Sequence, residues 1–96
     1  MKEILLLIRG KIQGVGFRAL VKRIALSLQI RGWVQNRPDG TVLILAQGTH
    51  EGLLLFQERL SSIHHKPFGP DVEGTKLQEE KELGGSALKP SFLVVP

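Results

Sequence analysis

Residues 3–46 read EILLLIRGKIQGVGFRALVKRIALSLQIRGWVQNRPDGTVLILA, and the pattern of this stretch decides the expected fold. Glu3–Arg9 contains five consecutive apolar residues, a run typical of a strand that is buried on both faces. The three glycines within Gly10–Gly16 predict a loop. From Phe17 to Ile30, apolar residues recur at i, i+3, i+4, i+7, i+8 and i+11, which predicts an amphipathic helix.

A hairpin is expected directly after this helix. Gly32–Asn36 and Thr41–Ala46 have the composition of strands, and the sequence Arg-Pro-Asp-Gly at 37–40 joins them. Proline sets φ in such a turn, aspartate can bond to its own backbone, and glycine tolerates a positive φ. The two strands should therefore be antiparallel neighbours.

The second half of the chain predicts one more helix and two more strands. Thr49 is a suitable N-cap for a helix whose apolar residues lie on or beside one stripe: Leu53, Leu54, Phe56, Leu60 and Ile63. Residues 64–71 contain two prolines and a glycine and should form a loop. Val72–Glu82 is expected to be a more polar strand, and Phe92–Val95 a short last strand.

The resulting order is β-α-β-β-α-β with an extra short C-terminal strand. Right-handed crossovers would place two helices on one face of an antiparallel sheet, which is the α+β class and the ferredoxin-like α/β sandwich. A chain of 96 residues suits a single domain over residues 1–96. It is too short for a two-halved dinucleotide-binding fold or a TIM barrel.

Composition excludes several classes of protein. There is no cysteine, so disulfide frameworks, cysteine-bound zinc, iron–sulfur clusters and thiolate nucleophiles are ruled out. The first apolar run, five residues long, is too short for a secretion signal or a membrane span. We therefore expect a cytoplasmic protein that does not associate with membranes.

Charge is distributed unevenly along the chain. The net charge is +4, but residues 1–48 carry eight Lys and Arg against two acidic residues, whereas residues 49–96 have a net charge of −2. A basic half suits an anionic partner. The alternative is a basic surface that is merely solvated.

The segment from Gly10 to Arg18 carries the chemistry, because it leaves a strand, turns on glycines and enters a helix. Backbone N–H groups at a helix start lack partners within the helix, and the helix dipole favours an anion there. Such a loop can bind phosphate or carboxylate. A cation in the first turn, such as Arg18, is disfavoured by the dipole unless an anion binds beside it. A tight turn with an exposed arginine is the alternative.

Two other phosphate motifs are rejected. The Walker A pattern GxxxxGK[ST] is absent from the sequence. Gly14, Gly16 and Ala19 match GxGxx[GA], but Asp39, 20 residues further on, lies in the expected hairpin turn. A dinucleotide-binding fold would place this acidic residue at the end of a parallel strand.

Residues 10–18, GKIQGVGFR, followed by residues 32–42, GWVQNRPDGTV, closely resemble the two motifs of the acylphosphatase family in order and spacing. The resemblance is strong over residues 4–48, continues through the second expected helix, and fades after residue 70. Gln29 stands where the family usually has the glycine that closes the first helix.

The resemblance implies a small enzyme that hydrolyses acyl phosphates such as acetyl phosphate, with no metal and no cofactor. Arg18 would bind the phosphoryl group, and Asn36 would orient the attacking water. The phosphoryl oxygens would be bound by backbone N–H groups of the loop. These groups belong to Gln13, Gly14, Val15, Gly16 and Phe17. The chemistry is consistent, because a carboxylate leaving group needs no general acid and charge stabilisation with positioning suffices. Taken alone, Asn36 could equally satisfy local backbone groups.

Two other functions compete with hydrolysis. The resemblance extends to acylphosphatase-like domains of larger carbamoyl-transferring proteins, so a non-catalytic module that binds an anion or carbamoyl phosphate is the first alternative. A nucleic-acid-binding domain of the same fold is the second, but four Phe, one Trp and no Tyr offer few stacking platforms.

The expected partner is therefore a small-molecule acyl phosphate, with phosphate or sulfate able to bind the loop. We expect neither a membrane nor a nucleic acid as a partner, and we expect a monomer. His50, His64 and His65 are interpreted as surface residues rather than metal ligands. Trp33 and Phe17 are expected in the core.

Overall fold

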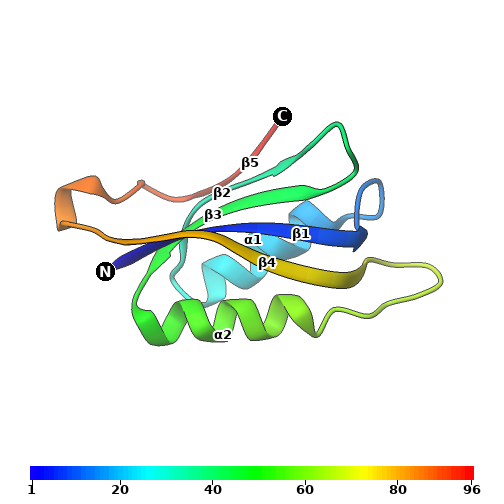
Figure 1. The fold of residues 1–96 in the computed structure, drawn as a ribbon, viewed down its shortest axis with the longest axis horizontal. Helices are drawn as coiled ribbons and strands as arrows, with labels where there is room; N and C mark the ends of the chain where they lie inside the picture. Colours follow the sequence, from blue (N-terminus) through cyan, green and yellow to red (C-terminus); the bar gives the residue numbers. More distant parts are fainter.

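The order of helices and strands in the computed structural model, which describes residues 1–96 except for the side chain of Ser86, is the predicted one. The elements are listed here in chain order (Figure 1): β1 (Lys2–Lys11), α1 (Phe17–Ser27), β2 (Arg31–Asn36), β3 (Val42–Gly48), α2 (His50–Ser61), β4 (Asp71–Glu82), the short 3₁₀ turn η1 (Gly85–Ala87) and β5 (Phe92–Val95). No helix in the described part of the chain is long and apolar enough to cross a membrane.

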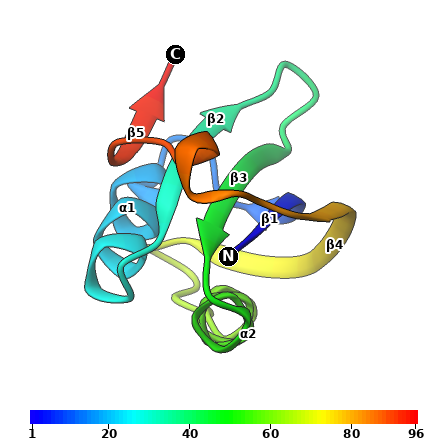
Figure 2. The ribbon, with the colours of Figure 1, turned by 90° about the vertical axis from the view of Figure 1, so that its left-hand side faces the viewer.

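One five-stranded sheet runs in the order β4-β1-β3-β2-β5, with both helices on the same face (Figure 2). β1 pairs antiparallel with β3 and β4, and β2 pairs antiparallel with β3. The ferredoxin-like sandwich is therefore confirmed.

The expectation of an antiparallel sheet is wrong at one edge, because β5 pairs parallel with β2, with Gly32 opposite Phe92. β4 ends where β2 begins, and residues 83–91 cross the sheet at that same end (Figure 1). β5 therefore starts beside the start of β2, where the amide of Gly32 donates to the carbonyl of Ser91 at 2.9 Å. The sheet is mixed.

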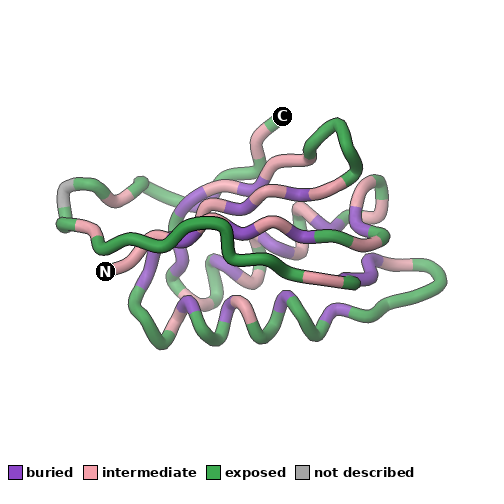
Figure 3. Tube along the Cα trace, in the orientation of Figure 1, coloured by how far each residue is buried: buried purple, intermediate pink, exposed green. Residues whose placement is uncertain are grey.

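The core lies between the sheet and the helices (Figure 3). Burial alternates along β1, so this strand is covered on one face only, and the expectation of burial on both faces is wrong. Leu5 and Leu7 are half-buried on the open face, as is Trp33, which we expected in the core. The large side chains that are almost fully buried include Ile4, Leu6, Ile8, Phe17, Ile44, Phe56, Leu60 and Phe92.

Helix α1 ends at Ser27, three residues before the predicted end. Gln29 adopts a left-handed conformation with φ 58°, which stops the helix. The amide of Ile30 then donates to the carbonyl of Ala25 at 2.8 Å, and that of Gln29 to Leu26 at 3.2 Å. This is the pair of bonds of a Schellman cap, a position that usually holds glycine.

Helix α2 begins as predicted, since the hydroxyl of Thr49 accepts a hydrogen bond from the amide of Gly52 at 3.0 Å. The predicted apolar stripe is correct at Leu53, Phe56 and Leu60, which are buried. Leu54 is exposed, and Ile63 is buried although it lies beyond the helix end.

Candidate functional site

The loop between β1 and α1 turns on two left-handed glycines. Gly14 and Gly16 both have φ 77°, a conformation that other residues rarely adopt. Gly16 precedes the first residue of α1, whose first turn has neither a side-chain cap nor an acidic residue. The first amides of a helix have no acceptor within it. The start of α1 is therefore a positive helix end with no negative group of its own to balance it.

Arg18 lies in the first turn of α1 and borders a cavity of about 260 Å³. Its Nη1 donates to the carbonyl of Val95 in β5 at 3.1 Å. Among the described ion pairs, none involves Arg18. The guanidinium is thus held by a neutral backbone group, which leaves its charge for an anion.

Asn36 is the last residue of β2 and lines the same cavity as Arg18. Its Oδ1 is buried and accepts no hydrogen bond from the described residues. Buried polar atoms usually have a hydrogen-bond partner, so this oxygen is an acceptor available to a bound molecule. A carbonyl oxygen in this position can accept a hydrogen bond from a water molecule or a ligand inside the cavity.

The remaining predicted residues differ in where they lie. The cavity is bordered by Gly14, Gly16, Phe17 and Arg18, together with Ile12, Ala19, Asn36 and Val94. Phe17 is 1% exposed, so its ring belongs to the core. Gln13 and Val15 do not border the cavity, and both are half-buried in the loop.

The side chain of Gln13 has a partner that the sequence did not predict. Its Nε2 donates to the carbonyl of Arg37 at 2.7 Å and to that of Thr41 at 2.9 Å. Both acceptors belong to the turn between β2 and β3, directly after Asn36. No spacing rule could have found this contact, because the partners are 24 and 28 residues away.

Val94 was also missed as a cavity residue. It lies in β5, opposite Val34 of β2, and is 40% exposed. The sequence signal for β5 was only a short apolar run, and it gave no strand partner. Pairing with β2 is what brings Val94 beside Arg18.

The histidines lie on the surface, as expected. His50, His64 and His65 are exposed, and among the described residues no group of three or more His, Asp or Glu side chains could share a metal ion. His64 Nδ1 is 3.3 Å from Asp71 Oδ1, and Lys66 Nζ is 3.3 Å from Asp71 Oδ2. Burial alone would raise the pKa of Asp71, but these two partners outweigh that effect and lower it below its usual value.

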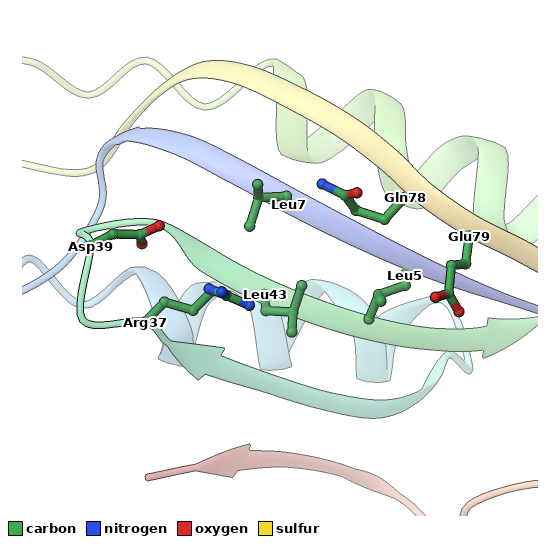
Figure 4. Close-up of a pocket in the computed structure, with 7 residues that line it drawn as sticks. All are labelled: Leu5, Leu7, Arg37, Asp39, Leu43, Gln78 and Glu79. Carbon is green, nitrogen blue, oxygen red and sulfur yellow. The ribbon is translucent and has the colours of Figure 1, made fainter.

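A second hollow lies on the open face of the sheet (Figure 4). Arg37 and Asp39 come from the β2–β3 turn at one end of it, and β4 contributes polar side chains. Its lining is Leu5, Leu7, Arg37, Asp39, Leu43, Gln78 and Glu79. Neither a helix start nor a glycine loop borders this hollow, so the cavity beside Arg18 is the candidate site.

Comparison with known proteins gives one consistent answer. The model of a family described as Acylphosphatase matches residues 4–87. An acylphosphatase of Thermus thermophilus is 38% identical over 87 residues, covering 88% of this chain and 92% of the relative. An acylphosphatase of Nitratidesulfovibrio vulgaris is 53% identical over 51 residues, an alignment that spans only about half of each protein, 53% of this chain and 51% of the relative.

Among solved structures, the crystal structure of acylphosphatase from Bacillus subtilis is similar over the full length of both chains. The TM-score is 0.85 and the sequence identity is 34%. The similarity therefore includes the loop at Gly14, the turn after Asn36 and the strand β5.

Proposed function

The chain belongs to the acylphosphatase family, and from that premise we propose that it hydrolyses acyl phosphates to a carboxylate and inorganic phosphate. The observation that carries the proposal is a single cavity of about 260 Å³ bordered by Gly14, Gly16, Arg18 and Asn36. A substrate of this kind combines a phosphoryl anion with a good leaving group. The loop and Arg18 suit the phosphoryl anion, and a good leaving group needs no proton donor in the cavity.

The phosphoryl group is bound by the loop and by Arg18. Backbone N–H groups of residues 13–17 donate to its oxygens, and the planar guanidinium donates two parallel hydrogen bonds. The support is electrostatic. The start of α1 has no acidic residue, and the charge of Arg18 has no carboxylate partner among the described residues.

The attacking water is held by Asn36. Its Oδ1 accepts a hydrogen bond from the water, which turns an oxygen lone pair toward phosphorus. The support is the buried Oδ1 without a donor partner. Water oxygen then bonds to phosphorus, the bond between phosphorus and the acyl oxygen breaks, and the carboxylate leaves with the electron pair. The water protons pass to the product phosphate and to solvent.

The lining explains why an acyl phosphate fits better than a phosphate monoester. A carboxylate is a weak base and leaves without being protonated, whereas an alkoxide requires a proton donor. The described residues that border the cavity include no His, Asp, Glu or Lys, and an arginine does not give up its proton. Catalysis therefore rests on positioning and on stabilising negative charge.

The test is hydrolysis of acetyl phosphate in the presence of EDTA. Removing one positioned donor typically costs about 10²–10³ in rate, so Arg18→Ala and Asn36→Ala should lose at least that much. Arg18→Lys should also fail, because a point charge does not replace the planar fork. Arg23→Ala is the matched control, since Arg23 is exposed on the same helix. Wild-type rates in both alanine variants would refute these roles.

The first alternative, a non-catalytic module, predicts phosphate or carbamoyl phosphate binding without turnover. Calorimetry with inorganic phosphate, run beside the hydrolysis assay, separates the two. If the protein hydrolyses acyl phosphates, phosphate and sulfate should bind the loop and act as competitive inhibitors.

We also propose that residues 1–96 act as one domain and as a monomer, supported by one sheet and one core. Sedimentation at assay concentration tests the oligomeric state.

A further inference from the structure

Gln13 lies in the phosphate loop, but its side chain does not border the cavity. The carboxamide nitrogen instead donates both of its protons to the β2–β3 turn, to the carbonyls of Arg37 at 2.7 Å and Thr41 at 2.9 Å. Both contacts have the length of good hydrogen bonds. A neutral amide has two donor protons on one nitrogen, which is what two neighbouring carbonyls require.

The turn that receives these bonds is itself well ordered by hydrogen bonds. The amide of Arg37 donates to the carbonyl of Thr41 at 2.9 Å, and the amide of Gly40 donates to the carbonyl of Arg37 at 3.1 Å. The carboxylate of Asp39 accepts from the amide of Thr41 at 3.0 Å. A bond to either carbonyl is therefore a bond to a closed turn rather than to a loose loop.

Asn36 immediately precedes this turn and lies opposite Val42 of β3, so the turn and the sheet together set its position. The β1–β3 pairing ends at Ile8 opposite Val42, and Val42 lies opposite Asn36 in the β2–β3 pairing. Among the described side-chain hydrogen bonds, those of Gln13 are the ones that join the phosphate loop to the β2–β3 turn. Beyond this last row of the sheet, one carboxamide joins the two halves of the site.

We propose that Gln13 is a positioning residue, whose side chain fixes the distance between the phosphate-binding loop and the water held by Asn36. The inference rests on the proposed hydrolysis of acyl phosphates. Gln13 acts through Asn36 and not on the substrate. A misplacement of about 1 Å at a reacting group can cost up to about 10² in rate, so loss of these bonds should be visible in kcat.

The variant Gln13→Met keeps the length of the side chain and removes both donor protons. We expect kcat for acetyl phosphate to fall by about tenfold or more, because the water is displaced from its line of attack. The inhibition constant for inorganic phosphate should change by less than about threefold, since Arg18 and the loop amides remain in place. Gln57→Met is the matched control, because Gln57 bonds only within α2, to the carbonyl of Leu53 at 3.2 Å.

A double-mutant cycle with Asn36→Ala gives the decisive readout. If Gln13 acts through Asn36, Gln13→Met should lower kcat by less than about twofold in the Asn36→Ala background. An equal loss of kcat in both backgrounds would overturn the inference and indicate a general structural role. A large rise in the phosphate inhibition constant with kcat unchanged would overturn it too.

Amide hydrogen exchange keeps this test independent of the proposed activity. In Gln13→Met, the amides of Arg37 and Gly40 should exchange faster than in the wild type, while those of α2 should not change. Unchanged exchange in the turn would refute the positioning role of Gln13 even if the enzyme is active. If exchange is faster in the variant but the wild-type protein hydrolyses no acyl phosphate, the proposed function is refuted. The conclusion that Gln13 holds the turn would still stand.

Discussion

Replacement of Gln29 by glycine should stabilise the protein. Gln29 has φ 58° in the cap that ends α1, and its side chain is exposed. A left-handed conformation costs an L-residue roughly 1–2 kcal/mol, and glycine does not incur this cost. Glycine gains about 0.4–1 kcal/mol of extra freedom in the unfolded chain, which offsets part of the benefit. The free energy of unfolding should therefore rise by about 0.5–1 kcal/mol.

Urea unfolding of wild type, Gln29→Gly and Gln29→Ala measures this effect. Gln29→Ala is the matched control, because it shortens the side chain and keeps the left-handed strain. The midpoint should rise only in Gln29→Gly, with the slope unchanged. Activity should not change, since α1 has 11 residues and its two ends lie about 16 Å apart. A Gln29→Gly protein no more stable than the wild type would refute the reasoning from strain.

Three further substitutions test the core, a cap and an ion pair. Thr49→Ala should lower the free energy of unfolding by about 1 kcal/mol in urea, because it removes the N-cap of α2. Asp71→Asn should lower the unfolding temperature at pH 6. Since folding lowers the pKa of Asp71, its contribution is present above the unfolded value of 3.8 and is lost as pH falls through the folded value, so thermal scans of the two proteins should converge at low pH. Phe92→Ala should cost about 3–5 kcal/mol of stability in urea and also reduce acetyl phosphate hydrolysis, because β5 holds Arg18.

The parts of the fold that the sequence could predict are the ones that depend on local patterns. The helical periodicity that starts at Phe17 and the Pro-Asp-Gly turn after Asn36 both involve neighbouring residues, and both were correct. The predicted end of α1 is too late, because apolar residues continue past the point where Gln29 turns left-handed. Periodicity reports which face is apolar, but it does not report a reversal of backbone handedness.

The direction of β5 could not be predicted for a different reason. It depends on how residues 83–91 travel across the end of the sheet, and their sequence has no helical or strand period. The candidate site followed the same division. Arg18 is predicted from residue type and its place at the helix start, and Asn36 is implied by the resemblance to the family, whereas the contact of Gln13 with the turn depends on tertiary packing. Contacts between segments that are distant in the sequence cannot be predicted from these local patterns.

The bond between Arg18 and the carbonyl of Val95 joins residues that are 77 positions apart. In the sheet, only β2 and β3 are neighbours both in space and in sequence. Chains dominated by such distant pairings fold more slowly than helical proteins of similar stability. The entropy of closing a long loop is lost before the stabilising contacts can form. During synthesis, the glycine loop leaves the ribosome long before β5 does. The contact that holds Arg18 can therefore form only after β5 has been made.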